Sequence, residues 1–401
     1  MAENRLTALT QRIGQLPFVT ISIIALNVLA TAMARSDMIY YECYVAVYGL
    51  VPEHFRVGSL LSSTFIHDGY VHLAMNMALL YVFGSAVERA MGRLEYVMFY
   101  IGACFAASLM HIAIVYATLP PYYATRAVVG ASGAVAGVMG VYAVRFHRRS
   151  FHFGGMELPA LLLIMLWLIL QVVLGVLGLY RDEVLGLGLK QVGYWSHLGG
   201  FGFGIGVALI ANMALHGERE YLINQAARND AEGNLLEAIQ NYEHLLKYDP
   251  DNALCHAEIG RLWGILEEED DSLRNFHMAI ELYVSQGQEE KALEVAQQMA
   301  QFWPSTNLSS ATRFRLASYL EEAGQPERAI AAFEQIAQSD PDSAEAQMSL
   351  LKVGQLQLIS LGKPSLAILT LHSFLDRYPR SEWRRFAVET LLRAEGTSPH
   401  V

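Results

Sequence analysis

Residues 130–144 read Gly-Ala-Ser-Gly-Ala-Val-Ala-Gly-Val-Met-Gly-Val-Tyr-Ala-Val, a stretch of small and apolar side chains that contains Ser132. A second apolar stretch, residues 192–215, contains His197 near its start. Both approach the length of a membrane-spanning helix, and polar groups at membrane depth are costly unless they face a cavity or each other. If both stretches enter the membrane from the same side, Ser132 and His197 lie at similar depth. A nucleophile and its general base need that arrangement.

Six apolar stretches of the first half are long enough to span a bilayer, or nearly so. They cover residues 16–34, 69–87, 94–119, 127–144, 158–180 and 192–215. Arginines cluster before the first stretch, between the second and third, and between the fourth and fifth. Because positively charged loops stay cytoplasmic, the N-terminus and the second half of the chain are predicted to be cytoplasmic. The second, fourth and sixth stretches then run from outside to inside.

Helix rise predicts the depth of the polar side chains in these stretches. Ser132 and His197 each lie about five residues into their stretch, which corresponds to a depth of about 8 Å below the outer boundary. His72 and Asn76 lie three and seven residues into the second stretch, which also begins outside. Four polar side chains from three stretches are therefore expected to converge on the outer side.

The charge of the chain is unevenly divided. Residues 1–216 carry 12 Lys and Arg against 10 Asp and Glu, whereas residues 217–401 carry 16 against 29. The first part is apolar and charge-poor, and the second is charged like a soluble domain. The excess of acidic residues in the second part argues against nucleic-acid binding, which needs a basic surface. The three cysteines show no metal-ligand spacing and predict no disulfide framework.

The second part of the chain repeats. Four glycine–proline pairs have a constant spacing: Gly233 and Pro250, Gly287 and Pro304, Gly324 and Pro341, Gly362 and Pro379. At one fixed offset after each glycine there is a small residue: Ala238, Ala292, Ala329 and Ala367. A glycine turn, a helix with a small packing residue and a proline stop predict stacked helical hairpins. An extra helix pair is expected at 252–285, where two signatures lie farther apart.

Two interpretations of Ser132 compete when its own stretch is considered alone. Gly133, Gly137 and Gly140 make a small-residue face, which is typical of close helix packing. From this stretch alone, helix packing is the favoured interpretation of Ser132. Ala134 stands where a Gly-x-Ser-x-Gly hydrolase turn has its second glycine, so a nucleophile elbow of that kind is not predicted.

His197 shifts the balance toward catalysis. It shares a helical face with Gly200 and Gly204, so two glycine faces allow the serine and imidazole to meet. A Ser–His dyad is predicted rather than a triad, since no acidic residue lies at the same depth. His72 and Asn76 lie one helical turn apart and are interpreted as oxyanion stabilisers, with interhelical hydrogen bonding as the alternative.

Together these residues resemble a known family. Residues 64–77, Thr-Phe-Ile-His-Asp-Gly-Tyr-Val-His-Leu-Ala-Met-Asn-Met, resemble the second-helix signature of the rhomboid intramembrane serine proteases, and Gly84, Glu88 and Gly92 continue it. The stretch Gly130-Ala131-Ser132-Gly133 resembles the nucleophile motif of that family. His197 with Gly200 and Gly204 resembles its general-base helix. The repeats resemble tetratricopeptide repeats, which generally bind peptides or partner proteins.

The resemblance implies an all-α fold with a six-helix transmembrane bundle that cleaves transmembrane protein substrates near the outer face. It implies Ser132 as the nucleophile, His197 as the general base, His72 and Asn76 as oxyanion stabilisers, and no cofactor or metal. Two positions depart from the family. Residues 58–59, Gly-Ser, stand where many members have Trp-Arg, and Ala136 stands where many have an aromatic side chain that stacks on the histidine.

The predicted organisation has five parts. They are a cytoplasmic segment at 1–15, a membrane protease domain at 16–216, a helical linker or first repeat helix at 217–232, repeats at 233–395 and a tail at 396–401. The apolar run after residue 15 is expected to be a spanning helix rather than part of a cleaved signal. The predicted location is the cell inner membrane, with the site open to the periplasmic or outer side.

Two alternatives to a protease stay open at this point. One is a catalytically silent rhomboid-fold protein that binds or escorts membrane proteins. The other is a membrane scaffold whose small-residue helices only pack. For the repeats, recruitment of substrates or regulators and self-association are both consistent with the sequence, which identifies neither the substrate nor the partner.

Overall fold

The computed structural model describes residues 16–36, 38–185, 193–306 and 308–397. The predicted segment 1–15 and the end of the predicted tail lie outside the described residues. The chain divides into two compact units, Met1–Tyr221 and Leu222–Val401. This division falls inside helix α11 (Met213–Ala231), a helix that also contains the predicted boundary at 216. The domain limits themselves stay predictions.

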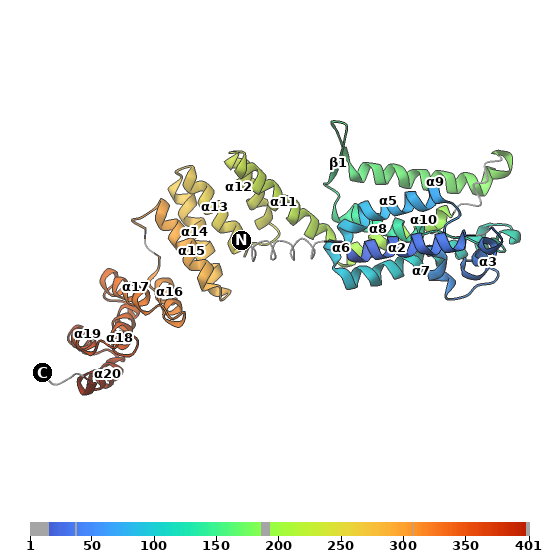
Figure 1. Cartoon of the computed structure of the whole chain (residues 1–401). Coiled ribbons are helices and arrows are strands. Elements are labelled where there is room, and N and C mark those ends of the chain that lie inside the picture. The colour runs from blue at the N-terminus through green and yellow to red at the C-terminus, as the bar shows by residue number, and fades with distance from the viewer. Residues whose placement is uncertain (1–15, 37, 186–192, 307, 398–401) are drawn as a thin grey trace. The chain divides into compact units, whose positions relative to one another are not determined.

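Helices make up most of the first unit, and one lies on each of the six predicted apolar stretches (Figure 1). They are α2 (Phe18–Ala34), the continuous α5 (Tyr70–Leu79), η2 (Leu80–Gly84) and α6 (Ser85–Met91), α7 (Arg93–Thr118), α8 (Ser132–Arg145), α9 (Ala160–Leu185) and α10 (Tyr194–Ile210). Between them lie α3 (Met38–Tyr48), α4 (Ser59–Ser62), η1 (Ser63–Phe65), η3 (Pro121–Tyr123) and an antiparallel hairpin of β1 (Ser150–Phe153) and β2 (Met156–Pro159).

The lengths and apolar compositions of these helices identify a membrane protein. Three helices in the described residues are long and apolar enough to cross a bilayer alone: Tyr70–Met91, Arg93–Thr118 and Ala160–Leu179. Helix α10 qualifies only together with α11, to which it is bent by 70°, and α2 is apolar but shorter. The predicted helical fold is therefore confirmed, whereas six as the number of spans stays a prediction.

Helix α8 lies at the buried centre of the first unit, with every residue from Gly133 to Ala143 buried. Its glycine face meets the glycine face of α10. A Cβ atom at Gly200 would overlap the carbonyl oxygen of Gly133, and one at Gly204 would overlap the carbonyl oxygen of Gly137. The two backbones are in direct contact, which only glycine permits at these positions.

Glu88 binds the N-terminus of α2. Its carboxylate accepts hydrogen bonds from the backbone N–H of Val19 at 3.0 Å and of Thr20 at 2.8 Å, and from the Thr20 hydroxyl at 2.7 Å. The first N–H groups of a helix have no partner within the helix, and negative charge is favourable there. This buried glutamate therefore fixes α2 to α6.

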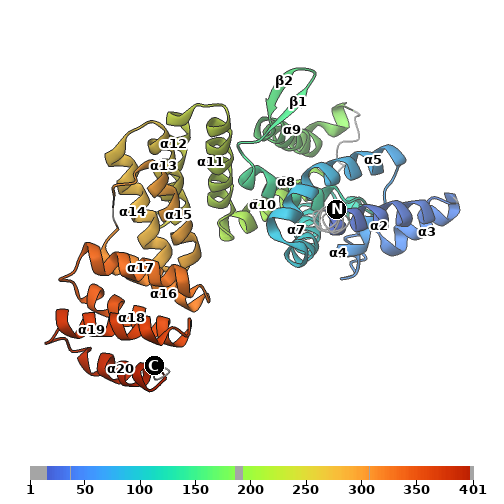
Figure 2. The same cartoon turned by 60° about the vertical axis from the view of Figure 1, so that its left-hand side comes forward.

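The second unit consists of helices that pack against their neighbours in sequence (Figure 2). They are α12 (Leu235–Leu246), α13 (Ala253–Ile265), α14 (Glu269–Ser285), α15 (Glu289–Phe302), α16 (Ser310–Glu322), α17 (Pro326–Ser339), α18 (Ala344–Ile359), α19 (Pro364–Arg377) and α20 (Arg384–Thr397). All four repeat glycines have positive φ angles, and the four alanines that follow them are fully buried. The extra pair expected at 252–285 corresponds to α13 and α14.

Candidate active site

The loop before α8 makes Ser132 the first residue of that helix. Val128 pairs with Leu50 in an antiparallel bridge, and the N–H of Gly130 donates to the carbonyl oxygen of Ser63 at 2.9 Å. Gly130 then turns the chain with a φ of 123°, a conformation that residues with a side chain rarely adopt. Helix α8 starts two residues later.

The prediction that Ser132 lies about five residues inside a helix is therefore wrong. Tertiary hydrogen bonds hold the preceding residues extended, although their apolar composition is compatible with a helix. A position at the start of a helix is chemically distinct, because the N–H groups in the first turn of a helix lack intrahelical partners. Ser132 thus lies beside N–H groups that have no partner within the helix, at the positive end of the helix dipole.

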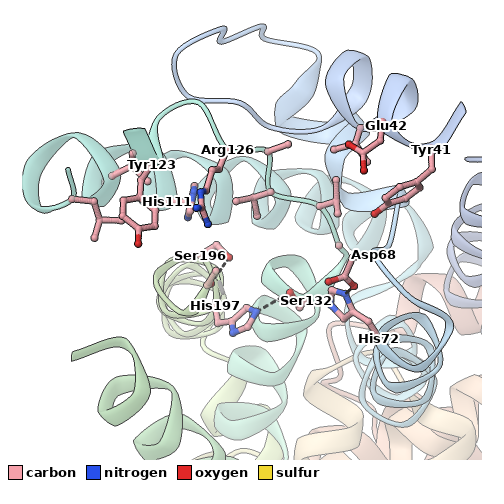
Figure 3. Close-up of a pocket in the computed structure, with 18 residues that line it drawn as sticks. Tyr41, Glu42, Asp68, His72, His111, Tyr123, Arg126, Ser132, Ser196 and His197 are labelled. Atoms are coloured by element: carbon pink, nitrogen blue, oxygen red, sulfur yellow. Dashed lines mark hydrogen bonds and ion pairs between the residues drawn. The ribbon is translucent and has the colours of Figure 1, made fainter. Parts of the chain in front are cut away.

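His197 lies in the first turn of α10 and contacts Ser132 (Figure 3). Its Nε2 atom is 2.7 Å from Ser132 Oγ, and its Nδ1 atom is 2.7 Å from the side-chain oxygen of Gln171. An amide oxygen only accepts hydrogen bonds, so this pairing requires the tautomer in which Nδ1 carries the proton and Nε2 accepts from the serine hydroxyl. A general base for the serine needs this tautomer.

In Figure 3, Ser132 lies between His197 and His72. The His72 ring packs against Gly130, where a Cβ atom would come within 2.8 Å of Cε1. Its Nδ1 atom lies 2.5 Å from a carboxylate oxygen of Asp68. Asn76 is buried, and its amide donates to the backbone carbonyl of His72 at 3.1 Å.

A cavity of about 670 Å³ opens beside these side chains, and Ser132, His197 and His72 all line it. Asn76 is not among the residues that line the cavity, so three of the four predicted polar side chains meet there. Charged side chains also line it: Glu42 from α3, Asp68 before α5, and Arg126 before α8. A polar cavity of this size admits water to Ser132.

The described residues contain no group of three His, Cys, Asp or Glu side chains that could hold a metal ion. Two of the histidines at the cavity, His72 and His197, have other partners. Nδ1 of His72 binds Asp68, and both ring nitrogens of His197 bind Ser132 and Gln171. His111, on α7, also lines the cavity.

Comparison with known proteins identifies a domain in this part of the chain. Residues 54–213, from the segment before α4 through α10, match the family model of the Rhomboid domain. The chain carries a rhomboid domain. A curated relative, "Putative rhomboid protease YdcA" of Bacillus subtilis (strain 168), is 32% identical over 83 residues. The aligned segment covers 21% of this chain and spans 38% of the length of that relative.

C-terminal to the rhomboid domain, residues 310–353 match the family model of a tetratricopeptide repeat. Two solved structures resemble the chain only weakly. MamA is 14% identical with a TM-score of 0.23, and the match covers 41% of this chain and 93% of MamA. A thermophilic repeat protein of Thermus thermophilus is 16% identical with a TM-score of 0.21, and the match covers 45% of this chain and 98% of that protein.

Two residues of the rhomboid domain that contact His197 were not predicted from the sequence to belong to the site. Gln171 is the only amide or charged side chain in the stretch 158–180, and it is 7% exposed. A lone amide in an apolar helix is itself a signal of a buried polar contact. Trp167, one turn earlier, has its ring centroid 5.9 Å from that of His197. α9 thus supplies an aromatic contact to His197, whereas α8 has only Ala136 at the expected position. Tyr194 of α10 also lies edge-on to the His197 ring.

Proposed function

We propose that this protein is an intramembrane serine endopeptidase in which Ser132 is the nucleophile and His197 the general base. The observation that carries the proposal is the 2.7 Å contact between Ser132 Oγ and His197 Nε2. The contact lies at a polar cavity within a rhomboid domain. A packing role alone requires neither the cavity nor a histidine within hydrogen-bonding distance of the serine.

The proposed reaction has two steps. In the first, His197 Nε2 takes the proton of Ser132 as Oγ attacks the scissile carbonyl carbon. The tetrahedral intermediate then expels the amine, which receives that proton from His197, and an acyl ester on Ser132 remains. In the second step, water from the cavity attacks the ester, again with His197 as the base, and releases the carboxylic acid and Ser132.

The charge on the tetrahedral oxygen needs hydrogen-bond donors. The N–H groups at the start of α8 that lack intrahelical partners are one source, and the His72 side chain is another. With Nδ1 donating to Asp68, His72 donates from Nε2 only in the form that carries a proton on both ring nitrogens. Asn76 now donates to the backbone of its own helix, so its direct participation requires a change of rotamer. We therefore assign His72 the larger share of the side-chain stabilisation.

The proposed location is the cell inner membrane, with the cavity open to the outer or periplasmic side. Ser132 begins α8 and Arg145 ends it, so the two lie about 20 Å apart along the helix axis. Arg148 and Arg149 follow. Because arginine-rich loops stay cytoplasmic, Ser132 is directed outward, and the N-terminus and repeats are cytoplasmic.

The proposed substrates are membrane proteins cleaved in or next to a transmembrane segment. A backbone amide within a helix is sterically shielded, so the substrate must unwind locally to reach Ser132. The tetratricopeptide match supports a second role for residues 233–395, which is binding of a protein or peptide partner on the cytoplasmic side.

The experiment is cleavage of a single-span substrate by the purified full chain in detergent. We expect Ser132→Ala and His197→Ala each to lower turnover by about 10⁴-fold or more, as for other serine hydrolases. Both variants should keep the wild-type melting temperature within a few degrees. Full activity in purified Ser132→Ala contradicts the proposed nucleophile.

The principal alternative is a catalytically silent protein of the same fold that binds or escorts membrane proteins. A serine-directed fluorophosphonate separates the two, because only an activated hydroxyl reacts with it. Labelling of the wild type but not of Ser132→Ala supports the protease. The absence of both labelling and cleavage in folded wild-type protein favours the alternative.

A further inference from the structure

We propose that Gln171 on α9 is a positioning residue for the general base, and that it takes the place of an acidic third member beside Ser132 and His197. This inference rests on the proposed protease function. Its basis is a side-chain contact between the consecutive helices α9 and α10, at positions 26 residues apart.

The contact is short and buried. Gln171 Oε1 lies 2.7 Å from His197 Nδ1, on the opposite side of the ring from the 2.7 Å contact with Ser132 Oγ. A neutral imidazole exchanges its proton between its two nitrogens, and only one tautomer leaves Nε2 free to accept from serine. An acceptor at Nδ1 selects that tautomer and also fixes the plane of the ring.

The position of Gln171 within α9 indicates that its contact with His197 has a functional role. Leu166, Leu170 and Val173 of α9 are exposed apolar residues, as expected for a helix that faces lipid. Gln171 lies on the opposite, inward face with Ile164. An amide placed in such a helix is unfavourable unless a partner satisfies it. The partner found in the structure is the proposed general base.

Other contacts align α9 with α10. A Cβ atom added at Gly175 would lie 3.4 Å from Tyr194 Cβ and 3.5 Å from Trp195, so the helices approach closely one turn beyond Gln171. One turn before Gln171, Trp167 stacks obliquely on His197, at an interplanar angle of 36°. Helix α9 thus holds the imidazole by one hydrogen bond and one ring contact.

The test compares three full-length variants with the wild type. Gln171→Met keeps the length of the side chain but loses the strong acceptor. Gln171→Glu keeps an acceptor oxygen at the same distance from the backbone. Val172→Met is the matched control, because Val172 is exposed on the other face of the same helix.

The steady-state prediction is a loss in kcat and not in KM. We expect Gln171→Met to lower kcat by roughly 10- to 100-fold, less than the loss of about 10⁴ when the aspartate of a Ser–His–Asp triad is replaced. The KM should stay within about twofold, since Gln171 does not line the cavity. Gln171→Glu should recover most of the kcat, and Val172→Met should match the wild type. A Gln171→Met enzyme with wild-type kcat, or a Gln171→Glu enzyme no better than Gln171→Met, overturns the proposal.

A second readout does not depend on proteolysis. The ¹⁵N chemical shifts of imidazole report which ring nitrogen carries the proton, and the signal of His197 is assigned by its loss in His197→Gln. We expect a protonated Nδ1 in the wild type and a mixture of tautomers in Gln171→Met. An unchanged tautomer contradicts the role of Gln171 even if the chain cleaves no substrate. Failure of the protease proposal is recognised separately, by absence of labelling in the wild type.

Discussion

At the scale of single residues, Gly130 determines where the proposed nucleophile lies. Its φ of 123° ends the extended segment and lets α8 begin at Ser132. Its missing side chain also makes room for His72. One glycine therefore supports both the start of the helix and the position of a proposed oxyanion donor.

We predict that Gly130→Ala lowers kcat/KM more than tenfold while the protein stays folded. The backbone strain of a non-glycine residue in this conformation is about 1–3 kcal/mol, and the new methyl group displaces His72. Gly202→Ala is the control, because a Cβ atom at Gly202 meets nothing within 4 Å. Cleavage assays and thermal melts of both variants in one detergent provide the comparison. Equal activity of Gly130→Ala and wild type argues against this role.

At the scale of elements, the approach of α8 and α10 brings Ser132 and His197 together. The glycine faces of α8 and α10 pack the two helices closely, and the same close packing brings Ser132 within reach of His197. Helix packing and catalysis are therefore compatible interpretations of the Ser132 region. Any side chain at the interface separates the helices and lengthens the contact between serine and histidine.

Gly204→Ala tests this interface. Its methyl group would overlap the carbonyl oxygen of Gly137, so the helices must move apart. Overpacking of this kind typically lowers the free energy of unfolding by about 1–3 kcal/mol. We expect a lower melting temperature together with slower fluorophosphonate labelling of Ser132. Gly206→Ala, on an open face of the same helix, should change neither. A Gly204→Ala protein as stable and as reactive as Gly206→Ala contradicts this account.

At the scale of the whole molecule, α11 is the helix in which the membrane unit ends and the repeat unit begins. Its first part is fixed to the arginines that follow α8. Glu218 is buried and binds Arg148 with both carboxylate oxygens, at 2.9 and 3.1 Å, and Glu220 binds Arg145 at 2.5 Å. The end of α8 opposite Ser132 is thereby bound to the start of α11.

We predict that Glu218→Gln loosens residues 213–221 without changing cleavage of a generic substrate. Loss of this bidentate, partly exposed ion pair is expected to lower the local stability of the segment by about 1–2 kcal/mol of free energy. Hydrogen–deuterium exchange of the full chain should become faster in this segment. Glu237→Gln, an exposed glutamate on α12, is the control. Exchange unchanged in the first variant shows that the ion pair does not hold the helix.

Much of the architecture was predictable because its signals are local. Hydropathy located the six apolar helices, and the Gly–Ala–Pro spacing located the helical repeats, including the α13 and α14 pair. The motifs around residues 64–77, Ser132 and His197 indicated the rhomboid family, which the family match confirms over 54–213. The roles of the individual site residues stay predictions.

The sequence by itself determined which segments are apolar enough to form membrane helices and which of them contain reactive side chains. Only the tertiary structure decided that α8 starts at Ser132, that Asn76 is bonded within its own helix, and that Gln171 reaches His197. The start of α8 depends on hydrogen bonds from the preceding loop to Leu50, Ser63 and His67. The Gln171 contact depends on how closely α9 packs on α10. Helical periodicity describes one helix at a time, whereas these contacts join segments that meet only after folding.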